Sequence, residues 1–277
     1  MMRRLDLATQ WWVRRTGRTV NLARDTWLQG PAGDQAGIAE RWLPREAARR
    51  SADIEQGRAD AGLLASMSLL DGPRFQAAAL ADPVRDFYEH TSAWALSARV
   101  RWSRLAWPFG VLLGVLFARR LEQLALPLRT GDLAAGMTSS VTPLVVDGQQ
   151  VGASWLRRVR ATDRVVFSGY YDIAVAPATN GRCVRVSFPL PNGRLLVLLE
   201  PRVRPDGGLT LLSSTGRWAQ AGAYLVVEHA SECSARRIPV HEQFDIYTDD
   251  HGVLRTDHTL TLWHIPVLRL HYELTRK

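Results

Sequence analysis

The chain has 277 residues, enough for one large domain or two smaller ones with a hydrophobic core. Its formal net charge is +8, but Lys277 is the only lysine, and arginines are scattered from Arg3 to Arg276 without a recognisable nucleic-acid-binding motif. We therefore expect no nucleic acid among the partners, because an anionic membrane surface or an acidic ligand explains the charge at least as well.

Targeting signals and cysteines indicate the compartment. The N-terminal sequence MMRRLDLATQWWVRRTGR contains basic residues without the apolar stretch of a secretory signal. The two cysteines, Cys183 and Cys233, lie far apart and do not have the spacing of metal ligands. We predict a cytoplasmic protein with reduced cysteines, and association with a membrane is the alternative.

Residues 1–130 are predicted to form a helical region. Helices are expected over Arg3–Gln29, over Glu46–Leu70, and from Asp82 through Trp102, where Pro83 suits the first turn. The N-terminal helix is basic and contains Trp11 and Trp12. It can therefore either pack on the rest of the protein or rest on an anionic membrane surface.

Leu105–Ala118 is an uncharged stretch with arginines on both sides. It is shorter than the roughly 20 residues that a membrane-spanning helix needs. A buried core helix is the expected structure. Shallow insertion of 105–118 into one leaflet of an anionic membrane is the alternative, because tryptophan, phenylalanine and arginine suit that interface.

Residues 131–277 are predicted to form an antiparallel β-barrel domain. Strand-like runs follow one another, and Asp147-Gly148, Pro191-Asn192-Gly193 and Asp206-Gly207-Gly208 are hairpin signals between them. The nine expected strands are Val141–Val146, Val151–Val159, Val165–Val175, Cys183–Phe188, Leu195–Glu200, Leu209–Ser213, Ala223–His229, Val240–Tyr247 and Val253–Thr275. Because no helices separate them, we predict an α+β fold in which the helical region packs on a closed barrel of calycin (lipocalin-like) type.

The C-terminal stretch from His241 onward predicts the site. Asp249-Asp250-His251-Gly252 is typical of a three-residue hairpin loop that ends with a left-handed glycine. In that register Glu242 lies opposite Leu260 and one diagonal step from His258. The final strand is expected to bend at Pro266. The even-numbered, apolar face then carries Phe244, Ile246, Leu254, Leu260, Leu262, Leu268, Leu270, Tyr272 and Leu274, interrupted by Glu242, His258 and His264.

A barrel of about eight strands can hold one small ligand. We therefore predict binding of a hydrophobic or amphipathic small molecule, such as a lipid, isoprenoid or polyketide, inside the barrel. Arg255 faces outward in the preferred register. The expected ligand-binding residues are Tyr171, Glu242, Phe244, Arg255, His258, Leu260 and His264.

Two alternatives remain open. Glu242 and His258 could be the catalytic acid and base of a cofactor-independent cyclase or isomerase of secondary metabolism, although two buried polar groups can equally form a structural hydrogen bond. A peripheral membrane-associated structural protein is the second alternative, and it depends on Leu105–Ala118.

We expect neither a metal nor a cofactor. His241-Glu242 begins like the zinc motif HExxH, but position 245 is aspartate, and residues i and i+4 of a strand lie about 13 Å apart. The sequence contains no GxSxG, P-loop or GxGxxG motif of the common hydrolases, NTPases and dinucleotide enzymes.

Four stretches carry a resemblance to known proteins: FYEHTSAWALSARVRW, FARRLEQLALPL, FPLPNG and TDHTLTLWHIPVLRLHYEL. Together they resemble an actinobacterial family of uncharacterised proteins and, more distantly, the soluble C-terminal part of YndJ-like proteins of bacilli. The resemblance covers the chain from Asp82 to its end. It implies no activity, cofactor or catalytic residues, but some relatives have membrane segments, which favours the membrane-surface interpretation.

Overall fold

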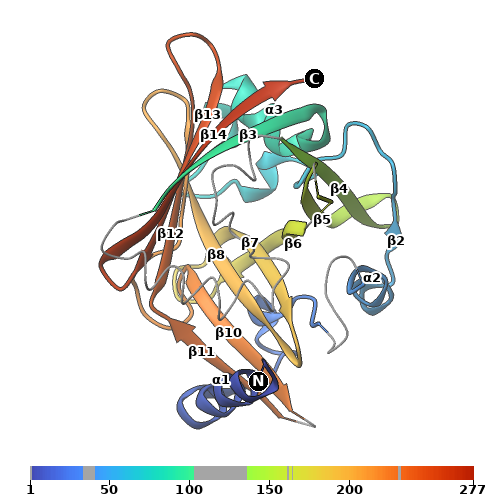
Figure 1. Cartoon of the computed structure of the whole chain (residues 1–277), viewed down its shortest axis with the longest axis vertical. Coiled ribbons are helices and arrows are strands. Elements are labelled where there is room, and N and C mark those ends of the chain that lie inside the picture. Colours follow the sequence, from blue (N-terminus) through green and yellow to red (C-terminus); the bar gives the residue numbers. More distant parts are fainter. Residues whose placement is uncertain (1, 34–40, 103–135, 161, 164, 230–231) are drawn as a thin grey trace.

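The computed structural model describes residues 2–33, 41–102, 136–160, 162–163, 165–229 and 232–277. Most of these residues belong to one 14-stranded sheet whose strand pairs are antiparallel, and few helices accompany it (Figure 1). The predicted α+β class with an antiparallel sheet is therefore confirmed.

The elements have the following bounds. The helices are α1 (Met2–Thr16), α2 (Leu43–Arg50) and α3 (Asp82–Glu89), with 3-10 turns η1 (Thr26–Leu28), η2 (Met67–Leu70), η3 (Ala77–Ala79) and η4 (Thr91–Ala93). The strands are β1 (Arg18–Val20), β2 (Asp53–Ile54), β3 (Trp94–Trp102), β4 (Met137–Val146), β5 (Gln149–Val159), β6 (Val165–Ala176), β7 (Gly181–Leu190), β8 (Gly193–Val203), β9 (Leu209–Leu212), β10 (Gly222–His229), β11 (Glu232–Ile238), β12 (Val240–Thr248), β13 (Leu254–Leu262) and β14 (Ile265–Arg276).

The sheet forks at β8. One side of β8 pairs with β7, whereas the other side pairs first with β10 and then with β9. The main branch runs β2-β4-β5-β6-β7-β8-β9-β12-β13-β14-β3, and the side branch adds β10, β11 and β1. The main path has two ends, so the paired strands in the described residues do not form the closed barrel that we expected.

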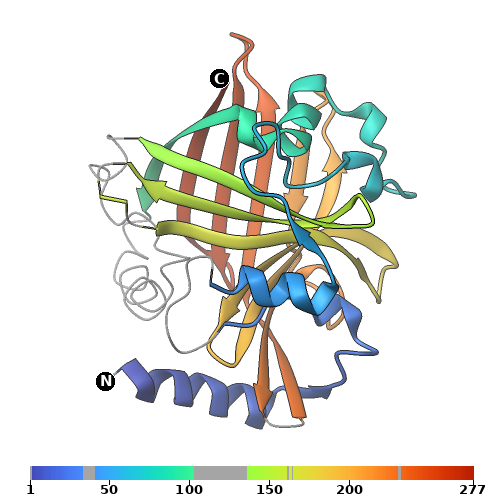
Figure 2. The ribbon, with the colours of Figure 1, turned by 90° about the vertical axis from the view of Figure 1, so that its right-hand side faces the viewer.

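The sheet instead curls over a central core. Figure 2 shows β4–β6 crossing in front of β12–β14, so the two parts of the sheet face each other. Trp155 and Tyr171 on one part belong to the same buried cluster as Ile246 and Leu254 on the other. Phe87 of α3 joins that cluster. The core therefore lies inside the curl, and α3 packs against it.

The N-terminal segments cover outer faces of the sheet. Leu195–Leu199 is apolar on both faces: Val197 faces the central core, whereas Leu196 and Leu198 belong to a second cluster with Trp27 and Leu28 of η1. N-terminal residues therefore cover the outer face of this strand. Two helices cover other parts of the sheet, α2 through a cluster with Leu144 and Tyr170, and α1 through Val13.

Three predicted helices are wrong in extent. The first ends at Thr16 instead of Gln29, and the second is reduced to α2. The third ends with α3, and Trp94–Trp102 forms strand β3, paired with β14. The reason lies in the pattern of this segment, where Trp94, Leu96, Ala98, Val100 and Trp102 alternate with less apolar residues at the period of a strand.

The predicted last strand is also wrong, because Val253–Thr275 forms a hairpin. β13 and β14 pair with each other, and the chain reverses at Trp263 and His264, where Trp263 has a φ of 52°. A register shift after Leu260 keeps Leu268 opposite Leu260, so the even-numbered residues stay on one face. The bend expected at Pro266 is thus a complete reversal three residues earlier.

The segment Leu105–Ala118 lies outside the described residues. Within those residues, no helix combines the length and apolar character that crossing a bilayer requires.

Candidate functional site

A cavity of about 130 Å³ lies inside the curl of the sheet. Residues from β3 to β9, from β12 to β14 and from α3 line it. Its wall is mainly apolar, with polar side chains at a few positions. The aromatic lining residues are Phe87, Tyr88, Trp155, Phe167, Tyr171, Phe188, Phe244 and Tyr272. Such a wall, with a few fixed polar groups, is typical of small-molecule sites.

Glu242 reaches the cavity from β12. The predicted hairpin register is confirmed: Asp249 N–H donates to the Val253 carbonyl, Gly252 has a φ of 77°, and Glu242 lies opposite Leu260. The Glu242 N–H also donates to Ser213 Oγ at 2.7 Å, which fixes the backbone at this point. The Glu242 side chain is 15% exposed, and burial raises the pKa of its carboxyl to about 7.

His258 lies next to Glu242 on β13. Its imidazole stacks on the Phe244 ring, with centroids 3.9 Å apart and planes inclined by 14°. Burial, and then the positive charge of Arg157, lowers the pKa of His258 to about 3, so the ring is neutral at physiological pH. Its Nε2 is buried and has no hydrogen-bond partner in the described part of the chain.

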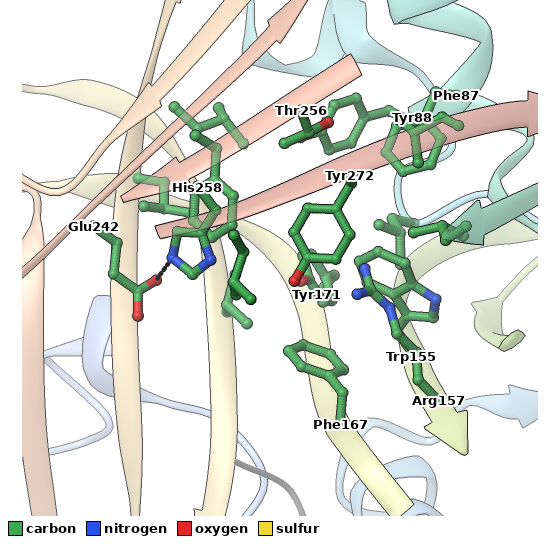
Figure 3. Close-up of a pocket in the computed structure, with 18 of the residues that line it drawn as sticks. Phe87, Tyr88, Trp155, Arg157, Phe167, Tyr171, Glu242, Thr256, His258 and Tyr272 are labelled. Atoms are coloured by element: carbon green, nitrogen blue, oxygen red, sulfur yellow. Dashed lines mark ion pairs between the residues drawn. The ribbon is translucent and has the colours of Figure 1, made fainter. Parts of the chain in front are cut away.

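The two side chains approach without bonding. His258 Nε2 and Glu242 Oε2 are 3.9 Å apart, the contact that the dashed line in Figure 3 marks, which is too long for a hydrogen bond. A neutral imidazole also forms no salt bridge with the carboxyl. Both groups can therefore exchange a proton or hydrogen bond with a third molecule placed between them.

Arg157 is a buried polar residue of the cavity that the sequence prediction missed. It is 8% exposed on β5, and its guanidinium carbon lies 3.6 Å from the centre of the Trp155 ring and 5.3 Å from those of Phe167 and Tyr272. A signal for it exists in the sequence. Arg157 and Arg158 are consecutive in a strand, so their side chains must point to opposite faces.

The structure separates the predicted ligand-binding residues into two groups. Tyr171, Glu242, Phe244, His258 and Leu260 all line the cavity.

Arg255 and His264, which we also predicted as ligand contacts, do not line the cavity, and their contact with a ligand stays a prediction. Arg255 faces outward, where it pairs with Asp249 at 2.8 Å and with Glu273. His264 is exposed in the β13–β14 turn, because the chain reverses there and does not continue as a strand.

No metal-binding cluster of three or more His, Cys, Asp or Glu side chains occurs among the residues that the structure describes. The site is thus built from one carboxyl, one imidazole and one guanidinium among aromatic rings.

Comparisons with known proteins give one informative match. No protein-family model matches the chain, and no solved structure matches it. The chain is 27% identical over 218 residues to the "Uncharacterized membrane protein YndJ" of Bacillus subtilis (strain 168), which covers 77% of this chain and 38% of that protein. The chain therefore spans well under half the length of YndJ. The match covers a larger share of the chain than residues 82–277, the range over which the sequence resemblance was expected. An identity of 27% does not show that the chain belongs to a family with YndJ.

Proposed function

We propose that this protein binds a small apolar or amphipathic molecule in the cavity inside the curled sheet. The observation that supports this role best is the lining, which combines eight aromatic side chains with the half-buried carboxyl of Glu242 and the buried side chains of His258 and Arg157. A calycin-like barrel in which β3 and β4 complete the ring is the architecture that we infer for this role, and contacts between these two strands support it.

The cavity volume limits the ligand. A dry cavity of about 150 Å³ can take up one benzene molecule. The 130 Å³ in this protein suits one small ring or a short branched chain. A long-chain lipid, isoprenoid or polyketide would therefore place one end in the cavity and leave the rest outside.

Toluene is a suitable probe for this function. We expect toluene to raise the melting temperature of the protein, since a ligand that binds only the folded state stabilises it. Leu260→Trp should abolish that rise, because Leu260 lines the cavity and the larger ring would fill it. The matched control is Leu262→Trp, a half-buried position on the same strand outside the lining.

The control should keep the toluene response of the wild-type protein. A melting temperature of the wild-type protein that does not change with toluene would contradict the proposed function. An equal toluene response in all three proteins would place binding outside this cavity.

A second candidate function is proton transfer, as in a cofactor-independent isomerase or cyclase. The unbonded pair of Glu242 and His258, 3.9 Å apart, favours it. With a pKa of about 7, Glu242 is partly ionised at neutral pH and can remove a proton from a carbon next to a carbonyl. The neutral His258 ring can then donate a hydrogen bond to the enolate oxygen.

Deuterium exchange tests this candidate. We expect the protein to speed exchange of the α-protons of 2-cyclohexenone in D₂O, followed by NMR, with a rate that rises as the pH passes through about 7 because the base must be ionised. Glu242→Gln should remove the effect. Glu273→Gln, a carboxyl on the neighbouring strand β14 that pairs with Arg255, should not. Exchange that survives in Glu242→Gln would show that this pair is not the catalyst.

A further inference from the structure

Among the residues that the structure describes, Arg157 is a buried arginine without an anionic partner, unlike Arg185 and Arg194. Arg185 pairs with Asp172 at 2.5 Å, and Arg194 pairs with Glu228. Arg157 is buried to a similar degree, yet in the described ranges no carboxylate lies within 4.0 Å of its guanidinium. Its Nε has no hydrogen-bond partner there, a feature that it shares with Arg194 Nε. A buried charge is costly unless it is paired, and the described residues do not supply Arg157 with a counter-ion.

The side chain of Arg157 lies at the wall of the cavity. Trp155, Phe167 and Tyr272, whose rings surround its guanidinium, all line the same cavity. Among the lining residues that the structure describes, Arg157 carries the one permanent positive charge. Figure 3 places the Tyr171 and Tyr272 rings between Arg157 on one side and Glu242 with His258 on the other.

We propose that the ligand of this cavity is a small apolar carboxylic acid whose carboxylate pairs with Arg157. This inference rests on the proposed binding function and specifies its ligand. The planar guanidinium forms two parallel hydrogen bonds with a carboxylate, a geometry that suits it better than a point charge would.

A singly charged ligand matches the single guanidinium. A phosphate carries more negative charge, and the described lining residues on the opposite side of the cavity provide no further cation to balance it, since His258 is neutral and Glu242 is an acid. The apolar body of the ligand then lies among the aromatic rings, and a hydroxyl or carbonyl at its far end can reach Glu242 and His258.

Binding of matched acids and amides to the 277-residue chain tests this inference. The probes are benzoate, hexanoate and cinnamate, each compared by calorimetric titration with its primary amide, which has nearly the same shape and no charge. We expect the wild-type protein to bind at least one acid about tenfold or more tightly than its amide, the range of one charge-assisted hydrogen-bonded pair.

Three variants locate the effect. Arg157→Met should reduce acid binding to the level of the amide and leave amide binding nearly unchanged, whereas Arg157→Lys should retain part of the preference for the acid. Arg158→Met is the matched control. Arg158 is the next residue of β5, and it pairs with the exposed Asp163 at 3.0 Å, so the preference for the acid should not change.

The outcomes separate this inference from the binding function itself. Binding of toluene and the amides without any preference for acids would overturn the inference and leave the binding function standing. An acid preference that survives in Arg157→Met would also overturn it. Failure of toluene, amides and acids alike would contradict both. Arg157→Met removes an unpaired buried charge, so the melting temperature of the variant without ligand should be at least as high as that of the wild-type protein. This measurement checks that the variant folds.

Discussion

Glu242 and His258 have pKa values shifted in opposite directions by burial. The folded protein raises the pKa of Glu242 from 4.5 to about 7 and lowers that of His258 from 6.5 to about 3. Between pH 4.5 and 6.5 the folded pair therefore holds its proton on the carboxyl, whereas the unfolded chain holds it on the imidazole. Both states then bind the same number of protons at this pair, so its two effects on the pH dependence of stability cancel in that range.

The variant Glu242→Gln separates these two contributions. The raised pKa means that Glu242 is most favourable to folding below pH 4.5 and loses this contribution as the pH rises to about 7. Gln does not ionise, so the unfolding free energy of the variant relative to the wild-type protein should increase from about pH 4 to about pH 8, by at most ~3 kcal/mol. Urea unfolding at the two pH values measures this difference.

Glu273→Gln provides the control for that experiment. Its carboxyl is 43% exposed and pairs with Arg255, so the relative stability should change little with pH. A difference between Glu242→Gln and the wild-type protein that is the same at both pH values would contradict the assigned pKa shift.

At the scale of single residues, the sequence predicted the placement of Glu242 and His258, because both positions follow from the register that one turn sets. The Asp249–Gly252 loop sets the register of β12 and β13, and that register brings Glu242 close to His258. Arg157 was missed because it lies on a strand far from that turn, and the one signal for it, two consecutive arginines in a strand, does not show which of the two points inward. His264 was misplaced since the reversal at Trp263 depends on pairing of β14 with both β13 and β3.

The helix α2 is fixed to the sheet by a buried network of charges. Asp172 of β6 accepts hydrogen bonds from Arg185 at 2.7 and 2.5 Å and from Arg50 of α2 at 2.8 Å. Arg50 also bonds Glu46 within the helix. Burial alone would raise the pKa of Glu46, but hydrogen bonds from Arg49 and Arg50 outweigh burial and lower it. One carboxylate of the sheet thus links the helix to β7.

Asp172→Asn should destabilise the protein strongly. Removing the charge leaves Arg185, which is 4% exposed, without an anion, and loss of one partner of a buried pair typically costs about 3 kcal/mol or more. Chemical denaturation measures the loss. The control Asp163→Asn removes a carboxylate that is 81% exposed and should change stability by less than about 1 kcal/mol. Equal, small effects of the two variants would show that the network adds little.

At the scale of the elements, strands that end in recognisable hairpin residues were predicted from the sequence, and strands without such residues were missed or misjudged in extent. Eight of the nine expected strands occur near their expected positions, since hairpin residues such as Asp147 and Gly148, both with positive φ, mark their ends. The ninth is a hairpin, because an apolar run alone does not reveal a reversal. β11 was missed: Cys233 and Ala235, which it buries, are small and give a weak alternation.

At the scale of the whole molecule, the two largest hydrophobic clusters among the described residues share strand β8. β8 directs Val197 into the central core and Leu196 into the core around Trp27, so the wall of the cavity at β8 is packed on both faces. The proposed cavity therefore has a rigid wall on that side. Whether 1–130 and 131–277 are separate domains stays a prediction, although β3 from the first range pairs with β14 from the second.

Membrane association also stays a prediction at this scale. Leu7 and Trp11 of α1 are 60% and 65% exposed, and Trp263 in the β13–β14 turn is 60% exposed. Arg14 and Arg15 lie in the last turn of α1. The α1 residues among them give the N-terminal helix the amphipathic and basic character on which the prediction was based.

The pairing of β3 with β14 has a consequence for biosynthesis. Residues 94–102 leave the ribosome long before residues 265–276, so β3 cannot pair with β14 while the intervening strands are being made. Trp94 and Trp102 therefore belong to an incompletely folded chain until then. Contacts between segments so far apart in sequence also slow the last step of folding, the pairing of β3 with β14. Nascent chains of this protein should therefore depend on chaperones until β14 has emerged.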